Sequence, residues 1–145
     1  MSSAGQQLVA DRIPGERINT TERNSASSGF TTTETVLDSV TASLVAGRTY
    51  KVRAVEPIQS TVADDLVRFR LRQDNVSGSQ LWLDNFSLPV GSVNFMHGME
   101  AEFTATATAD KTFVATAVRQ TGTGTLTSGA SSAQKALLYV DFISG

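Results

Sequence analysis

Val67-Arg68-Phe69-Arg70-Leu71-Arg72 is the stretch that decides the fold of this chain. Apolar and charged side chains alternate through it, and a period of two sends one set to each face of an extended strand. A strand with one apolar face has to bury that face against another layer. The stretch therefore predicts a sheet that is packed on one face and exposed to solvent on the other.

The same alternation recurs along most of the chain. It runs through residues 50–54, 101–107 and 113–117, and an apolar segment covers residues 136–143. No window of helical length shows a helical period. About eight short strands separated by turn residues predict an all-β fold, an antiparallel β-sandwich of jelly-roll or Greek-key type. The apolar last strand is expected at the centre of a sheet, because an exposed apolar edge invites aggregation.

These periods also predict the core. In the strand around residue 82, Trp82 and Asp84 are expected on the outer face. The side chains expected to point inward are Tyr50, Val52, Val67, Phe69, Leu71, Leu81, Leu83, Phe103, Phe113, Leu138, Val140 and Phe142.

The first 29 residues differ in composition from the rest. They are rich in Ser, Gly, Asn and Thr, hold few large apolar residues, and contain a Pro14–Gly15 turn signal. We expect an extended N-terminal attachment arm over residues 1–29 and a β-sandwich domain over residues 30–145. The side chains expected to attach the arm to a larger particle are Leu8, Val9, Ile13, Pro14, Arg17 and Ile18.

Composition favours a protein that works by contact over one that works by catalysis. Ser and Thr make up 34 of the 145 residues, Cys is absent and His occurs once, so thiolates and His pairs are missing. The net charge of −2 gives no broad attraction to nucleic acid or to an acidic membrane. No apolar stretch has the ~20 residues that span a bilayer, and the N-terminus lacks the pattern of a secretory signal. We expect no enzyme activity, no cofactor, no metal, and no nucleic-acid or membrane partner.

Several candidate sites lack the pattern that their chemistry needs. His97 has no second imidazole or thiolate with which to build a catalytic relay or a metal site. Asp64–Asp65 and Asp74–Asn75 offer oxygen ligands without the EF-hand spacing, and turn formation explains them. Residues 121–124 alternate Thr and Gly, but the Lys of a P-loop and the helix of a dinucleotide site are absent.

Glu100 and Glu102 lie on one face of a predicted strand. Their spacing alone is compatible with a glycosidase pair, although such acids normally come from different elements. We expect them instead to face the stripe of Arg68, Arg70 and Arg72 in a ladder across neighbouring strands, on the surface or between subunits. The stripe is not expected to grip nucleic acid, because it lacks interleaved exposed aromatics.

Trp82 is the single tryptophan. Together with Phe86 it offers flat rings on which a sugar could stack, and packing within the sheet is the alternative. Residues 73–80 and 91–98 are the loops that would supply further glycan contacts.

Five phrases of the chain carry a resemblance to known proteins. They are residues 29–36 (GFTTTETV), 46–52 (AGRTYKV), 63–65 (ADD) leading to 70–75 (RLRQDN), 111–114 (KTFV) and 138–145 (LYVDFISG). Together they resemble small β-sandwich virion proteins, of minor tail, decoration or fibre type, from tailed bacteriophages that infect actinobacteria. The resemblance covers about residue 29 to the end. It implies a virion exterior component assembled in the bacterial host cytoplasm, a homotrimer that contacts the major capsid protein or another virion protein, and it carries over no site residues.

Three functions stay open at this point. The first is an accessory decoration protein on the capsid exterior, attached through residues 1–29. The second is a minor tail or fibre-tip protein that binds host cell-surface glycan through Trp82. The third is a wall-degrading hydrolase that uses Glu100 and Glu102. The arm-plus-sandwich layout favours the first, and the shortage of catalytic side chains counts against the third.

Overall fold

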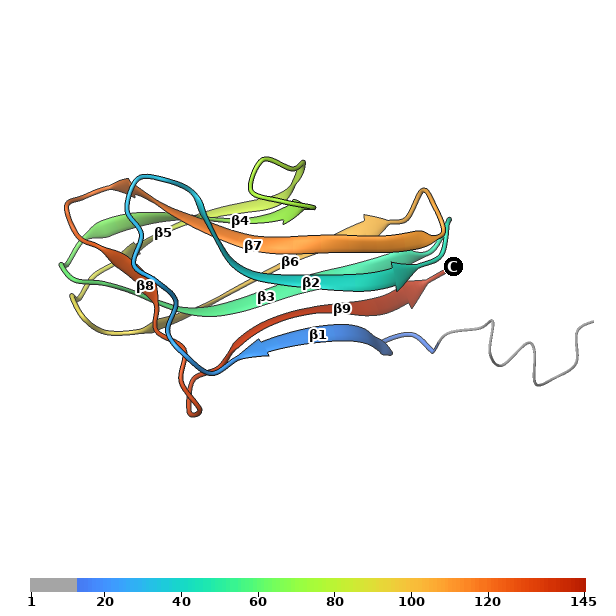
Figure 1. Cartoon of the computed structure of the whole chain (residues 1–145), viewed down its shortest axis with the longest axis horizontal. Coiled ribbons are helices and arrows are strands. Elements are labelled where there is room, and N and C mark those ends of the chain that lie inside the picture. Colours follow the sequence, from blue (N-terminus) through green and yellow to red (C-terminus); the bar gives the residue numbers. More distant parts are fainter. Residues whose placement is uncertain (1–12) are drawn as a thin grey trace, which may run out of the picture.

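The structure, a computed structural model, describes residues 13–145 as a two-layer antiparallel β-sandwich (Figure 1). This confirms the predicted fold class. The strands are β1 (Arg17–Arg23), β2 (Thr35–Leu44), β3 (Thr49–Ser60), β4 (Asp65–Gln73), β5 (Gln80–Leu88), β6 (Phe95–Thr104), β7 (Ala109–Thr121), β8 (Leu126–Ser128) and β9 (Ala136–Ser144).

Two sheets form the layers. The β3 sheet has the order β1-β9-β3-β6, with β8 beside the end of β3, and the β4 sheet has the order β2-β7-β4-β5. Within residues 13–145, only β4–β5 and β8–β9 connect strands of the same sheet, and the other six connections pass from one sheet to the other, as in Greek-key sandwiches. β9 lies between β1 and β3, which confirms the central position predicted for the apolar last strand (Figure 1).

The alternation in β4 sorts its side chains as predicted. Val67, Phe69 and Leu71 are fully buried, while Arg68 and Arg70 lie on the other face. Of the predicted inward set, all but one are buried or pack half-buried against the core. The period-two pattern is therefore a good guide to the core wherever the strand is regular.

Leu83 is the exception, and the register of β5 explains it. Leu83 lies opposite Arg70, whereas Trp82 lies opposite Leu71, and residues directly opposite one another share a face. Trp82 therefore points toward the inner layer and Leu83 away from it, the reverse of the prediction. A register shift between Leu71 and Arg72 leaves Leu81 as an extra residue. If the Arg72–Gln80 register had continued along the strand, Leu81 and Leu83 would have faced the core side chains of β4 as predicted.

β1 lies within the segment that was expected to be an arm. It pairs with β9 from Arg17 to Arg23, and Ile18 packs against the core. Arg17 binds the Asp141 carboxylate, and its guanidinium stands 3.7 Å from the centre of the Tyr139 ring. The expected boundary at residue 29 is wrong for this stretch, because β9 is an interior strand whose backbone groups need a partner on both sides.

The start of the described chain lies beside its end. The Gly15 N–H donates to the Phe142 carbonyl at 2.7 Å, and the Phe142 N–H donates to the Glu16 carbonyl at 2.9 Å. Residues 13–16 and the C-terminus therefore lie at the same end of the sandwich (Figure 1).

Side chains close the edge where β1 of one sheet meets β2 of the other. Asn19 Nδ2 donates to the Thr41 carbonyl and Thr21 Oγ1 donates to the Ser39 carbonyl, both at 2.7 Å. These bonds replace, across the gap between the sheets, the backbone bonds that edge strands lack.

Deeper at this edge, a buried polar cluster crosses between the sheets. Arg23 Nη2 donates to Asp38 at 3.2 Å, to Glu56 at 3.1 Å and to Ser128 Oγ at 2.6 Å. Ser128 Oγ donates to the same Glu56 oxygen at 2.7 Å. Burial, and then the nearby Asp38 carboxylate, raises the pKa of Glu56 from 4.5 to about 9. Glu56 is therefore protonated at neutral pH, and Asp38 balances the charge of Arg23.

The protonated Glu56 makes stability fall as pH rises. Between pH 4.5 and about 9 the folded protein holds a proton that the unfolded chain releases, so the free energy of unfolding drops by up to about 1.4 kcal/mol per pH unit from this group. Glu56→Gln keeps an acceptor for Arg23 and Ser128 but does not titrate. We expect the stability of the variant, relative to the native protein, to increase steadily from pH 5 to pH 8 in urea denaturation. Glu102→Gln, at an exposed site of the same sheet, is the matched control, and parallel pH curves for Glu56→Gln and the native protein would contradict the assignment.

Candidate functional site

The edge of the sandwich opposite β1 and β2 is open. β5 is the last strand of the β4 sheet, β6 is the last strand of the β3 sheet, and the two are not paired with each other. On β6, Phe103 lies opposite buried Tyr50 and Ala101 opposite buried Val52, so both point inward. We call the line between β5 and β6 the open seam.

His97 closes one part of the open seam. Its Nε2 lies 2.8 Å from Oδ2 of Asp84 on β5. Its ring stacks on Phe86 with 3.9 Å between centroids and meets the edge of Phe69 at 5.9 Å. The imidazole therefore joins the two edge strands at this level.

Beyond His97 the seam widens into a hollow of about 400 Å³, which we call the Trp82 hollow. Ala101 projects only a methyl group inward there, where His97 projects a ring, so space remains opposite Trp82. The indole is 52% exposed although it lies on the inner face of β5. The lining residues are Lys51, Leu81, Trp82, Glu100, Ala101 and Glu102.

Charged groups form the rim of the Trp82 hollow. The Glu100 carboxylate lies 3.3 Å from Arg53 Nη1 and 3.9 Å from Lys51 Nζ, and Lys51 stands opposite Glu102 on the paired strands. Carboxylates accept hydrogen bonds and an ammonium donates three, so the rim can bond hydroxyl groups in both senses. An exposed aromatic face beside such a rim suits a ligand that is apolar on one face and hydroxylated at its edges.

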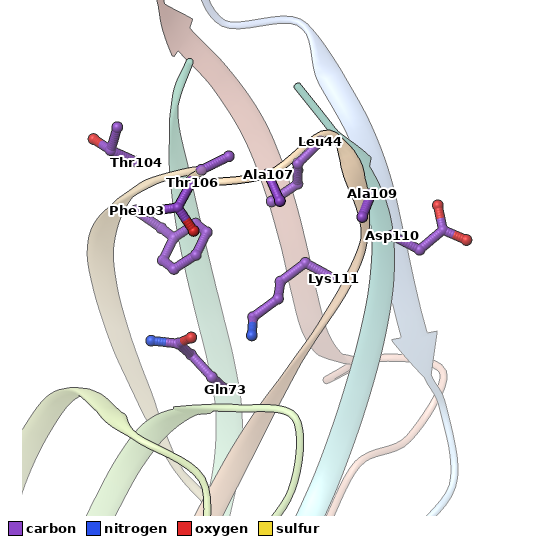
Figure 2. A pocket seen from close by; sticks show the side chains of 10 residues that line it. Leu44, Gln73, Phe103, Thr104, Thr106, Ala107, Ala109, Asp110 and Lys111 are labelled. Atoms are coloured by element: carbon purple, nitrogen blue, oxygen red, sulfur yellow. The ribbon is translucent and has the colours of Figure 1, made fainter. Parts of the chain in front are cut away.

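A second hollow, of about 300 Å³, lies where residues 105–108 connect β6 to β7 (Figure 2). We call it the Phe103 hollow. The ring of Phe103 and the side chains of Leu44 and Ala107 supply apolar walls, while Gln73 and Lys111 supply polar groups (Figure 2). The Lys111 ammonium lies 3.1 Å from the Asp74 carboxylate.

The predicted ladder between Arg68, Arg70 and Arg72 and the pair Glu100 and Glu102 is wrong. The arginines lie on β4 and the glutamates on β6, which belong to different sheets. A two-residue spacing predicts that each set shares a face, but it cannot predict which strands become neighbours.

The arginines bond instead on the outer face of the β4 sheet. Arg70 and Arg72 both bind Glu34, Thr116 Oγ1 donates to Glu34 at 2.8 Å, and Arg68 donates to Asn85 at 3.2 Å. Burial opposes the charged form of Glu34, but the hydrogen bonds from Arg72 and Thr116 and the charges of both arginines hold its pKa below the ordinary value. All three arginines therefore make their contacts within the chain.

The residues predicted to attach an arm are only partly placed. Leu8 and Val9 lie outside the described residues. Ile13 is 75% exposed and Pro14 is also exposed, so both are available for contact. Arg17 and Ile18 are used within the sheet, as described above. The predicted attachment role of all six residues stays a prediction.

The candidate calcium residues have local partners. Buried Asp65 accepts from Ser60 Oγ at 2.6 Å and from the backbone N–H groups of Thr123 and Gly124 at 3.1 and 3.0 Å. A Cβ at Gly124 would lie 2.1 Å from Ser60 Oγ, so the glycine serves this close approach. Within residues 13–145 there is no group of three or more acidic or His side chains placed to hold a metal ion. This part of the chain also has no helix long and apolar enough to cross a membrane.

Several residues of the two hollows were not predicted. Lys51, Ala101 and Lys111 are not among the predicted site residues, whereas Gln73 begins the predicted contact loop 73–80. No local signal marks them, because their importance depends on β5 and β6 being edge strands. The Glu100, Glu102 and Trp82 candidates do come together, although from different sheets.

The similarity of this chain to known proteins is confined to solved structures. No protein family and no curated protein matches the sequence. Among solved structures, the chain is similar to a CBM4 carbohydrate-binding module, with 15% identity, a TM-score of 0.40, and coverage of 79% of this chain and 80% of that one. It is also similar to the EclA C-terminal domain, described as a sugar-binding protein, with 14% identity, a TM-score of 0.39, and coverage of 97% and 86%.

A viral capsid protein is also among the similar structures. The VP2 subviral particle of infectious bursal disease virus has 8% identity and a TM-score of 0.46 over 88% of this chain, which spans 38% of that protein.

The His97 contacts predict a stabilising role. His97→Ala should lower the free energy of unfolding by about 1–3 kcal/mol, because it removes a hydrogen bond to a carboxylate and an aromatic stack. The adjacent Met96→Ala, on the outer face at 48% exposure, is the matched control and should change stability by less than about 0.5 kcal/mol. Equal effects of the two substitutions in urea denaturation would show that the seam contact contributes nothing.

Proposed function

We propose that this protein is a non-enzymatic component of a bacteriophage virion, and that it binds host cell-surface glycan in the Trp82 hollow. The observation that carries the glycan proposal is the half-exposed indole of Trp82 beside Glu100 and Glu102. The ring can cover the apolar face of a sugar while the carboxylates accept from its hydroxyls. The virion assignment rests on the resemblance carried by residues 29–145, and a tail or fibre tip is where glycan binding would serve attachment to a host.

The surroundings of the two glutamates support binding without hydrolysis. A glycosidase needs one carboxylic acid and one carboxylate on opposite sides of the scissile bond. Glu100 and Glu102 project from the same face of one strand, both are exposed, and Glu100 is balanced by Arg53 and Lys51. This arrangement suits ground-state recognition of hydroxyls.

Trp82→Ala should weaken binding to actinobacterial cell-wall polysaccharide at least tenfold, since a buried aromatic anchor typically supplies more than about 1.4 kcal/mol. Val90→Ala, another apolar side chain about half exposed, is the matched control and should bind normally. Isothermal titration calorimetry with the soluble polysaccharide measures the affinities. Release of reducing sugar measures any hydrolysis. Undiminished binding by Trp82→Ala would refute the site, and hydrolysis by the native protein would refute the non-enzymatic assignment.

Capsid decoration is the second candidate function. Ile13 is 75% exposed at the point where the described chain begins, and β1 fixes the following residues to the sheet. A short segment leading into a rigid strand suits attachment to a major capsid protein, and several copies in a homotrimer would bind more tightly than one.

Deletion of residues 1–12 tests this candidate better than deletion of the whole predicted arm. Removal of β1 would also leave one edge of β9 unpaired and Glu56 without Arg23. If the protein decorates the capsid, the 1–12 deletion should keep its fold and oligomeric state but no longer sediment with phage particles that lack the native protein. Circular dichroism and light scattering check the fold and the number of copies. Full binding by the deletion variant would exclude attachment through this segment.

A further inference from the structure

We propose that the Trp82 hollow and the Phe103 hollow are two subsites of one groove, and that the groove binds a linear glycan along β6. This inference rests on the proposed function of the Trp82 hollow and adds the class of ligand: a chain of sugar units instead of a single terminal sugar.

The two hollows adjoin along one strand. Ala101 and Glu102 line the Trp82 hollow, and the next two residues, Phe103 and Thr104, line the Phe103 hollow. From the β5 side, Leu81 lines the first hollow, while Gln73 of the paired strand β4 lines the second. From Glu100 to Thr104 the strand rises about 13 Å, which exceeds the length of one sugar ring. A ligand that fills both hollows has to be a chain.

The size of each hollow leads to the same conclusion. Binding sites for drug-sized ligands usually enclose roughly 300–1,000 Å³. The two hollows measure about 400 and about 300 Å³, at the low end of this range. Each therefore suits one ring, and together they suit an oligomer.

The chemistry of the Phe103 hollow repeats that of the Trp82 hollow with different residues. Each has one aromatic wall, Trp82 or Phe103, and polar groups at its rim. In the Phe103 hollow the side chains of Gln73 and Lys111 reach the cavity beside the ring (Figure 2). Lys111 is bonded to Asp74, which leaves further donors of the ammonium for sugar oxygens.

His97 sets the direction of the groove. Its contacts with Asp84 and Phe86 close the open seam on one side of the Trp82 hollow. The glycan chain therefore extends from Trp82 the other way, toward residues 105–108.

The test uses size-fractionated oligosaccharides released from an actinobacterial cell wall by partial acid hydrolysis. Trp82 is the only tryptophan, so its fluorescence reports occupancy of the Trp82 hollow by every fraction. We expect the native protein to bind tetra- and longer oligosaccharides at least tenfold more tightly than disaccharides. Gln73→Ala and Lys111→Met should remove this gain and leave disaccharide affinity unchanged. Arg68→Met, a cationic side chain on the outer face of the β4 sheet, is the matched control and should keep the gain.

The outcomes separate this inference from the proposed function. If affinity does not increase with chain length, or if Gln73→Ala and Lys111→Met keep the gain, the groove is refuted while the Trp82 site stands. If Trp82→Ala binds every fraction as the native protein does in calorimetry, the proposed function fails. Loss of disaccharide binding in Gln73→Ala would also contradict two separate subsites, and thermal unfolding of each variant shows whether a loss arises from misfolding.

Discussion

Packing of alternate side chains between two sheets is the constraint on which the rest of this molecule depends. It leaves two edges where the outermost strands of the sheets face each other without backbone hydrogen bonds. At the β1–β2 edge, Asn19, Thr21 and Arg23 bridge the gap. At the β5–β6 edge, His97 bridges one level, Met99 is buried at the next, and the small Ala101 leaves the level after that open. This difference between the edges places the Trp82 hollow on one side of the sandwich.

Much of the fold could be predicted from side-chain periodicity. The Val67–Phe69–Leu71 alternation and the apolar run after residue 135 correctly indicate an inner face and a central last strand. The β5 bulge could not be predicted, because Leu81 as an extra residue is decided by pairing with β4. For the same reason Arg70 could not be matched with Glu34, which is far away in sequence and comes from the segment before β2. Trp82 and the two glutamates were recognised as candidates, but their meeting across the open seam depends on strand order.

The buried polar cluster holds one edge of the sandwich together, and the stability of that edge depends on each member of the cluster. Arg23, Asp38 and Glu56 come from three strands in both sheets, and Glu56 contributes as a neutral acid. Removing one partner of such a cluster leaves a buried group without compensation, which costs more than the bond itself contributes. Residues 17–23, within the predicted attachment arm, are therefore a part of the structure that the domain needs.

The pairing of β1 with the last strand has a practical consequence for anyone attaching cargo to this protein. Since Gly15 and Phe142 are hydrogen-bonded, a fluorescent protein or affinity tag fused after Gly145 would crowd residues 13–16. The same closeness would let a short linker join Gly145 to Ile13 in a circular permutant that lacks residues 1–12, with new ends opened in a turn such as residues 75–78. A permuted chain would move any fused cargo away from that end of the sandwich.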